Sequence, residues 1–158
     1  MASKQQISKT TPVRPKRMTD GQRIFALIVG DALIFLIFAA IGRRSHGEQV
    51  GLDALLATIT TAVPFAAAWF LVSPFVGAFN RGLELQPRKM ALRTVLSWLS
   101  AWPLAMALRI FFVDYLTNHS INWRGIVSFS LITLISNTIL LLLWRWPFAL
   151  VVSRRRRS

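Results

Sequence analysis

Residues 24–48 read IFALIVGDALIFLIFAAIGRRSHGE. The first part is an apolar run that carries one acid, Asp31, and it ends at the polar sequence GRRSHGE, residues 42–48. The apolar run, at about residues 24–41, has eighteen residues, close to the roughly twenty that an α-helix needs to cross a bilayer core. An aspartate at the centre of such a helix costs roughly 3 kcal/mol, whereas about a dozen Leu, Ile, Phe and Val residues each return roughly 0.3 to 0.6 kcal/mol. Insertion is favoured, so this stretch predicts a transmembrane helix.

The alternative for this stretch is a cleaved secretory signal peptide, because a basic start followed by an apolar run fits that outline as well. Ala40 and Gly42 form a weak small-x-small match to a cleavage site. However, the run is too long for a signal peptide, contains Asp31, and is followed at once by Arg43 and Arg44. We therefore interpret it as a span that is not cleaved.

Three further apolar segments follow, at about residues 52–79, 92–113 and 126–144. The second segment contains Pro64 and Pro74, and we expect it to bend or to end early near Pro74. With the first segment, they predict an all-α, polytopic integral membrane protein whose four transmembrane helices form a compact bundle. The hydrophobic content of 54% over 158 residues agrees, because water-soluble domains of this size are less apolar.

The predicted membrane domain covers residues 22–147, with a basic tail on each side. Residues 1–21 are polar and basic and have little apolar surface to bury, so we expect a disordered tail. The sequence Trp-Arg-Trp-Pro at 144–147 is typical of an interfacial belt followed by a helix stop. After it we expect residues 148–158 to form a basic C-terminal tail.

The distribution of Lys and Arg predicts the orientation of the four spans. Both termini and the connection between the second and third spans lie on one side, which carries fifteen Lys and Arg residues when the C-terminal group is counted from Arg145. The other side carries three, Arg43, Arg44 and Arg124. The positive-inside rule therefore predicts a plasma-membrane protein with both termini in the cytoplasm. The C-terminal arginines either contact anionic lipid head groups or only anchor the topology; they are Arg154, Arg155, Arg156 and Arg157.

Composition and charge exclude several classes of function. The net charge is +13, but the basic residues fall in tails and short loops between apolar runs, so we expect no nucleic-acid partner. With no cysteine and two histidines, the chain predicts no metal cluster and no cofactor. The expected partner is the lipid bilayer. A transporter would favour a homo-oligomer, because one bundle of this size leaves little room for a substrate path.

Polar residues inside the spans are the candidate functional residues, because a bilayer makes them costly. With a helical rise of about 1.5 Å per residue, Asp31 lies roughly 12 Å from the cytoplasmic side, level with Ser100 and Asn137. We expect Asp31 to bond to their hydroxyl and amide rather than to Arg109, which lies roughly 25 Å in. The predicted inner layer is Asp31, Ser100 and Asn137; the predicted outer layer is Arg43, Arg44, His46, Glu48 and Arg109, with Asp114 beside it.

Each layer has two interpretations. Asp31 is either a proton carrier or cation ligand, as intramembrane acids often are, or a hydrogen-bonded link between helices. The three arginines of the outer layer either clamp a phosphate or carboxylate, with the histidine and glutamate available for acid-base chemistry, or pair with each other and with lipid phosphates in a tight turn.

Three motifs carry a resemblance to a known family. They are Gly-Asp-Ala-Leu at 30–33, the run from Phe38 to Glu48 that contains Gly-Arg-Arg-Ser-His-Gly, and Ala-Val-Pro-Phe at 62–65 with Trp69. On these residues the chain resembles a family of small bacterial and archaeal membrane proteins catalogued as DUF3054, a domain of unknown function. The resemblance covers roughly residues 23–146 and leaves out the basic tails. It implies a four-helix membrane protein and no established activity.

Three hypotheses of function follow. The first is a non-enzymatic, multi-pass membrane protein of unassigned biochemical activity. The second is a small proton-coupled or cation-coupled transporter that works as an oligomer and uses Asp31. The third is a membrane enzyme that acts on a lipid phosphate or isoprenoid phosphate at the outer face, which requires Arg43, Arg44 and His46 to converge on one pocket.

Overall fold

The computed structural model describes residues 18–45, 51–115 and 123–155. Within these ranges the chain is helical and has no strand, which confirms the all-α prediction. Four of the helices there are long and apolar enough to cross a membrane. They are α1 (Asp20–Ser45), α2 (Leu52–Val76), α3 (Pro87–Arg109) and α4 (Trp123–Arg155); a short 3-10 turn η1 (Leu83–Leu85) precedes α3, and a π-helical segment η2 (Ile110–Tyr115) follows it.

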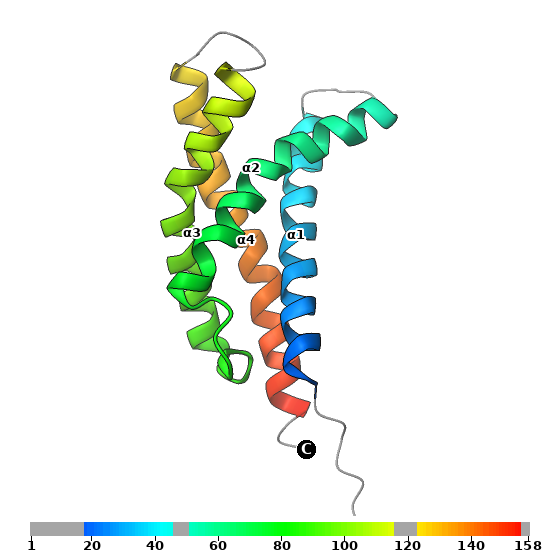
Figure 1. Cartoon of the computed structure of the whole chain (residues 1–158), viewed down its shortest axis with the longest axis vertical. Helices are drawn as coiled ribbons and strands as arrows, with labels where there is room; N and C mark the ends of the chain where they lie inside the picture. Colours follow the sequence, from blue (N-terminus) through cyan, green and yellow to red (C-terminus); the bar gives the residue numbers. More distant parts are fainter. Residues whose placement is uncertain (1–17, 46–50, 116–122, 156–158) are drawn as a thin grey trace, which may run out of the picture.

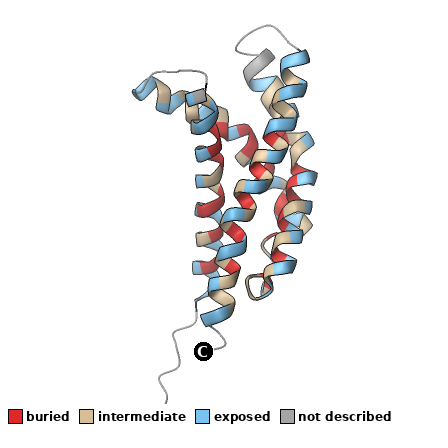
Figure 2. Cartoon of the chain, turned by 180° about the vertical axis from the view of Figure 1, so that it is seen from behind, coloured by how far each residue is buried: buried red, intermediate tan, exposed pale blue. Residues whose placement is uncertain are grey.

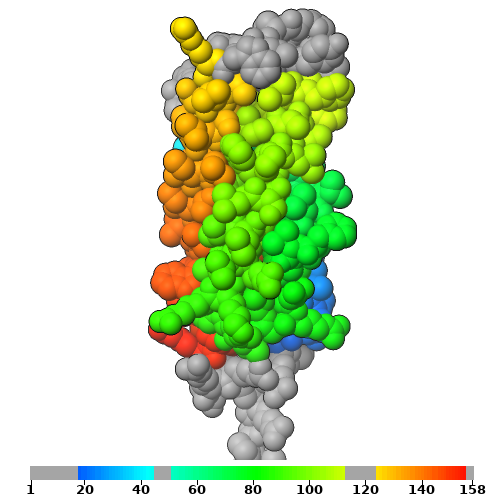
Figure 3. Space-filling view, turned by 90° about the vertical axis from the view of Figure 1, so that its left-hand side faces the viewer, coloured from blue at the N-terminus to red at the C-terminus, as the bar shows by residue number. Residues whose placement is uncertain are grey.

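The four helices run alternately up and down one long axis, so that α1 and α3 are antiparallel to α2 and α4 (Figure 1). Helix α3 packs against α2 and α4, and α1 completes the bundle by contacting the same two helices. The buried residues lie on the inner sides of the helices (Figure 2). A space-filling view of one face shows α3 in the middle, with α4 on one side and the lower part of α2 on the other (Figure 3).

Aromatic side chains fill the centre of the bundle. Phe35, Trp69 and Trp98 come from three different helices, are fully buried, and have ring centroids 5.6 to 6.4 Å apart. Small residues on α3 let the helices approach closely around these rings, because Ala101 and Ala105 are also fully buried. These two alanines are four residues apart, so they lie on one side of α3, and that side faces the interior.

Helix α1 begins earlier than its apolar run, because its first turn is capped. The Thr19 hydroxyl accepts a hydrogen bond from the Gln22 backbone N–H (3.2 Å), and the Gln22 side-chain oxygen accepts one from the Thr19 N–H (3.0 Å). This reciprocal capping box satisfies two helix-end donors. The helix consequently takes in Asp20 and Gly21, which we had assigned to the tail; residues 1–17 lie outside the described residues.

Helix α2 ends close to the position that its second proline predicts. Gly77 adopts a left-handed conformation (φ 88°), its N–H bonds to the Pro74 carbonyl, and the N–H of Ala78 bonds to the Ser73 carbonyl. A glycine suits this site because other residues are strained at positive φ. A side chain there would also meet Asn80, whose amide nitrogen lies 2.7 Å from the position of a Cβ.

Helix α4 does not stop at Pro147, where the sequence predicted an end, but continues to Arg155. Pro147 lies on the exposed side of the helix. Arg145 and Ala149, two residues before and after it, are both fully buried and fix the turns around the proline. Packing on the inner side therefore offsets the backbone hydrogen bond that proline removes. The segment expected to be a C-terminal tail is helical as far as the structure describes it.

Candidate functional site

A fully buried ion pair joins the first helix to the last. The Arg145 Nε donates to Asp31 Oδ1 at 2.9 Å, and Arg145 Nη2 donates to Asp31 Oδ2. Both side chains have 0% exposure. The planar guanidinium thus meets the planar carboxylate through two parallel hydrogen bonds, the strongest geometry for such a pair.

Helix α2 contributes a third partner to the pair. The Trp69 indole Nε1 donates to Asp31 Oδ2 at 2.9 Å, so both carboxylate oxygens accept hydrogen bonds. The guanidinium of Arg145 also lies 5.0 Å from the Trp69 ring centroid and 4.7 Å from that of Phe79, within the range of cation–π attraction. Trp69 therefore contacts both members of the pair, and Phe79, just beyond the end of α2, contacts Arg145.

The remaining donor of Arg145 binds backbone. Arg145 Nη1 donates to the carbonyl oxygen of Ala78 at 2.9 Å, just beyond the end of α2. Asp31 lies eleven residues into α1, roughly 16 Å along that helix. Because the same guanidinium holds Asp31 and Ala78, α2 ends at this depth and not level with the start of α1. The connection from α2 to α3 starts inside the bundle.

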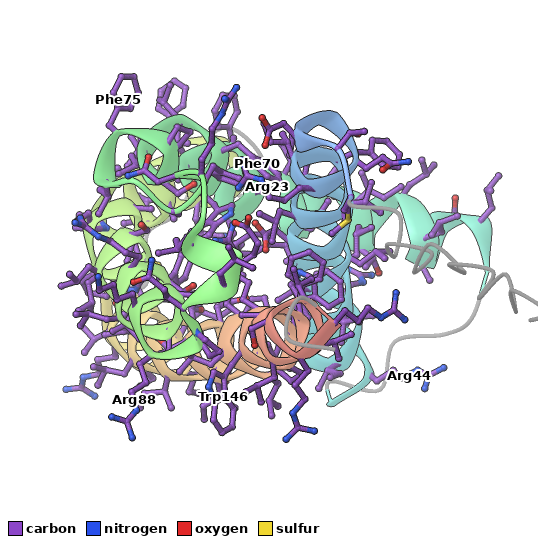
Figure 4. All side chains as sticks on the ribbon, turned by 90° about the horizontal axis from the view of Figure 1, so that it is seen from below. Arg23, Arg44, Phe70, Phe75, Arg88 and Trp146 are labelled. Carbon is purple, nitrogen blue, oxygen red and sulfur yellow. The ribbon has the colours of Figure 1, made fainter. Side chains whose placement is uncertain are left out.

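A second buried arginine continues the same arrangement. Arg23 of α1 is 4% exposed, and its Nη1 donates to the carbonyls of Phe79 (3.1 Å) and Asn80 (3.3 Å). Glu84 in η1 lies 3.5 Å from the same nitrogen. Seen from below, Arg23 lies among the helices, whereas Arg88 and Trp146 point outward (Figure 4). Arg23 therefore ties the connection to the first turns of α1.

A third arginine completes what we call the arginine clamp, which consists of Arg23, Arg93 and Arg145. Arg93 of α3 donates to the Val76 carbonyl at 3.0 Å from the surface of the bundle. Each of the other three helices thus supplies one arginine to the C-terminal end of α2 or to the residues just after it. Positive charge is favourable there, because the last carbonyls of a helix lack intrahelical donors and carry the negative end of its dipole.

The predicted inner layer is only partly present. Asn137 is fully buried, but its amide donates to the Thr133 carbonyl of its own helix (3.1 Å), and no contact with Asp31 is seen. Ser100 faces outward, and its hydroxyl donates to the Leu96 carbonyl (2.9 Å). The expectation that Ser100 lies in this layer needs correction, because it falls on the side of α3 opposite the buried stripe.

Four oxygens that belong to fully buried side chains have no hydrogen-bond partner within the described part of the chain. They are the hydroxyl oxygens of Ser73, Ser97 and Thr133 and the side-chain oxygen of Asn137, and all four residues have 0% exposure. The bond from Arg93 to Val76 sets the register of α2 and α3, which brings Ser73 and Ser97 to one level. The bond from Trp98 to the Leu134 carbonyl brings that level to the Thr133–Asn137 turn of α4. The interior of the bundle therefore carries polar atoms from three helices near this level.

Only part of the predicted outer layer lies among the described residues. Arg43 and Arg109 are half-buried, and the Arg109 guanidinium lies 4.9 Å from the Phe129 ring centroid. Arg44 is exposed and points away from the bundle (Figure 4). His46 and Glu48 lie outside the described residues. For Asp114 the structure describes the backbone only, in η2.

Sequence reasoning missed Arg145, which it assigned to the membrane interface. The neighbouring tryptophans and Pro147 gave that impression, yet an apolar run, Phe148–Val152, follows the proline. That run was the available signal that the helix continues. Arg145 then lies inside the helix, where a lone charge needs a partner.

Comparison with known proteins identifies the family. The family model described as "Protein of unknown function (DUF3054)" matches residues 28–148. The chain belongs to this family. The match includes Asp31, Arg145 and Trp69, whereas Arg23 lies before it. Neither the curated proteins nor the solved structures give a match to this DUF3054 chain.

Proposed function

We propose that this DUF3054 chain is a non-enzymatic, multi-pass protein of the plasma membrane. In this proposal the Asp31–Arg145 pair holds the helices together at the end of the bundle where Arg23 and the connection from α2 to α3 lie, which we call the inner end. The observation that carries this proposal is that each carboxylate oxygen of Asp31 and each guanidinium nitrogen of Arg145 has a hydrogen-bond partner in the protein. Both oxygens of Asp31 accept hydrogen bonds from the protein, and the Arg145 guanidinium donates to Asp31 and to Ala78. A group that must release a proton or an external cation needs room at these atoms, whereas a fastening needs them filled.

Membrane insertion with both termini in the cytoplasm is part of the proposal. Four apolar helices support insertion. With the buried Arg145 and Arg23 left out, the side of the termini keeps thirteen Lys and Arg residues against three on the other side. The positive-inside rule still favours the same orientation. A fluorescent reporter that folds only in the cytoplasm, fused after Ser158, should be bright; a dark fusion in membranes that contain the protein would overturn the orientation.

Contact with anionic lipids is proposed for the C-terminal arginines. Arg154 and Arg155 are exposed at the end of α4, and Arg156 and Arg157 lie outside the described residues. Each basic residue near an anionic surface contributes on the order of 1 kcal/mol of attraction. These side chains also anchor the proposed topology.

The proposal is tested by asking what the protein loses when the pair is removed as a unit. Wild type, Asp31→Asn and the double variant Asp31→Leu/Arg145→Leu are reconstituted in liposomes with a pH-sensitive dye inside. We expect no protein-dependent proton flux from any of them. Unfolding temperatures, measured from pH 5 to 9 and against phospholipids and small anions, should place Asp31→Asn below wild type at every pH. A proton flux that depends on Asp31 would overturn the proposal.

The second candidate function is a small cation-coupled carrier, in which separation of Asp31 from Arg145 opens the inner end. The observation in its favour is the group of unpartnered buried oxygens on α2, α3 and α4, since hydroxyl and amide oxygens are ligands for hard cations. Uptake of radioactive sodium into liposomes distinguishes the two functions. The carrier requires uptake by wild type and none by folded Asp31→Asn.

A membrane enzyme at the outer face is not proposed. That hypothesis requires Arg43, Arg44 and His46 to converge. Arg44 instead points outward, and no described residue joins it in a pocket.

A further inference from the structure

The first three turns of α2 form an amphipathic segment, which we call the α2 arm (Leu52–Val63). Its large apolar residues recur at intervals of three and four, and this spacing places them on one face of a helix. All are well exposed: they are Leu52 (74%), Leu55 (55%), Leu56 (55%), Ile59 (40%) and Val63 (54%). The opposite face carries only small residues, which are half-buried, and Asp53 and Thr60 lie at the edge between the two faces; the small residues are Ala54, Ala57, Thr58 and Thr61.

The threonines of the arm need no outside partner. The hydroxyls of Thr58, Thr60 and Thr61 donate to carbonyls three or four residues earlier in the same helix, at 2.7 to 3.1 Å. Their polar atoms are thus satisfied within the helix itself. Such a surface suits the boundary between water and acyl chains, where both faces of a helix find a matching environment.

The arm leaves the bundle. No residue from Gly51 to Thr61 is buried, and the first buried position of α2 is Ala62. The first turns of α2 extend past α1 at a steep angle to the bundle axis, at the end of the molecule where α1 finishes (Figure 1). The views from behind and from below agree (Figures 2 and 4). The exposed stripe continues down α2 at steps of four residues, through Ala67, Leu71 and Phe75.

The chemistry of its two faces decides how the arm lies in a membrane. Because the arm runs at a steep angle to the bundle axis, one of its sides faces the middle of the membrane and the other faces the head groups. An interfacial helix is most stable with its apolar face on the acyl chains. This places the leucine face toward the middle of the membrane, and the face with Ala54 and Thr61 toward the head groups.

The length of α2 agrees with this division. The part from Ala62 to Val76 has fifteen residues and rises roughly 22 Å, less than the roughly 30 Å thickness of a hydrocarbon core. The arginine clamp shows how the rest of the distance is covered. Arg145 and Arg23 bind the carbonyls of Ala78, Phe79 and Asn80, which lets non-helical backbone continue at membrane depth.

We infer that the α2 arm lies in the plane of the membrane, with its leucine face on the acyl chains and its other face at the phospholipid head groups of the leaflet opposite the termini. Arg43 and Arg44, at the neighbouring end of α1, place positive charge at the same level, which matches phosphate. Only the part of α2 after the arm crosses the bilayer. This inference rests on the membrane insertion that the proposed function includes.

The experiment uses the absence of cysteine from the chain, which makes single-cysteine variants of the full-length protein clean to label. Spin labels are placed at Leu52, Leu56 and Ile59 on the apolar face and at Ala54 and Thr61 on the opposite face. The protein is reconstituted in vesicles of phosphatidylcholine and phosphatidylglycerol. Depth is measured by power saturation with oxygen and a water-soluble nickel complex.

Labels on the apolar face should all report one shallow depth below the phosphates, and labels on the other face should be accessible to nickel. Depth then oscillates with the helical period and does not drift along the arm. A steady increase of depth from position 52 through position 56 to position 59 would overturn the inference. So would spin–spin broadening on the apolar face that disappears on dilution with unlabelled protein, because a second copy would then cover this face.

Exposed positions of α1 are the matched control: Leu33, Ile37 and Ile41. Labels there should differ in depth by roughly 6 Å at each step of four residues, as in a spanning helix. If the α1 series shows no such gradient, membrane insertion itself fails, and the proposed function fails with it. If α1 shows the gradient and the arm drifts as well, only the inference about the arm is wrong.

Discussion

The two ends of this bundle differ in which side chains they bury and which they expose. At the inner end, Asp31, Arg145 and Arg23 are buried and bonded to each other or to the backbone after α2. At the outer end, the α2 arm exposes its apolar side chains and buries none of its first ten residues. Both ends are built from apolar helices, so hydropathy alone does not separate them. The difference is that charged side chains bind the C-terminal end of α2 and the residues after it, whereas none of the described contacts does so at its N-terminal end.

In the membrane orientation proposed above, the inner end shows how a helix can stop within the bilayer. Bare carbonyls there are costly, because lipid offers no hydrogen-bond donor. Three arginines from three helices supply donors. One of them, Arg145, is also paired with the carboxylate of Asp31 on α1. The outer end has no such need, since the arm keeps its helical bonds and rests on its neighbours only lightly.

The largest effect should come from dividing the buried pair. Arg145→Leu leaves the carboxylate of Asp31 and the carbonyl of Ala78 without their charged donor, and we expect a loss of about 3 to 5 kcal/mol in the free energy of unfolding. Asp31→Leu should cost a similar amount. Denaturation in detergent, followed by tryptophan fluorescence or circular dichroism, measures both.

The double variant Asp31→Leu/Arg145→Leu serves as the control for this prediction. It removes both charges, so it should be more stable than either single variant, because neither charge is left buried alone. If the double variant is no better than the worse single variant, the charges do not act as a pair and the account of the inner end is wrong.

The next largest effect is expected at Gly30, beside the pair. A Cβ at Gly30 would lie 2.0 Å from the Trp144 ring, so Gly30→Ala must displace a large side chain of α4. Overpacking of this kind costs about 1 to 3 kcal/mol, and we expect the upper part of that range. Thermal unfolding should show the loss. Gly42→Ala is the matched control, because nothing lies within 4 Å of a Cβ there; an equal loss in both variants would contradict the contact.

An intermediate effect is expected from the second arginine of the clamp. Arg23→Gln removes the donors to Phe79 and Asn80, and hydrogen bonds from charged groups are worth about 1.5 to 3 kcal/mol. Hydrogen exchange should increase in residues 77–86 and remain unchanged in α3. Arg88→Gln, at an exposed arginine that points outward, is the control. Equal exchange in both variants would show that Arg23 does not hold the connection.

The smallest effect belongs to the outer end. Leu56→Ser changes an exposed residue of the α2 arm, so the free energy of unfolding in detergent should change by less than about 0.5 kcal/mol. A loss of more than about 2 kcal/mol would mean that the arm packs on something, and the contrast between the two ends would fail.

Much of this architecture is readable from the sequence. Long apolar runs predict the four helices, and the four-residue spacing of Ser97, Ala101 and Ala105 predicts the inner face of α3. Pro74 predicts the end of α2 within two residues of its position. These features are local or periodic, and a single chain contains them in full.

The candidate site was predictable only in part. Asp31 stands out as an acid within a span, but its partner lies 114 residues away, on a helix that Pro147 seemed to end. The depth estimate failed for Ser100 because distance along a helix does not say which side a residue faces. The arginine clamp depends on backbone carbonyls, which carry no mark in an amino-acid sequence.

The long separation of Asp31 and Arg145 also bears on the order in which the protein is made. At a synthesis rate of about 5 to 20 residues per second, roughly 6 to 23 seconds pass between the translation of the two residues. During that interval Asp31 lies in the first helix without Arg145 to pair with. A chain that ends before Arg145 would therefore keep an acid in its first apolar helix without its partner, and such a residue is costly in a membrane.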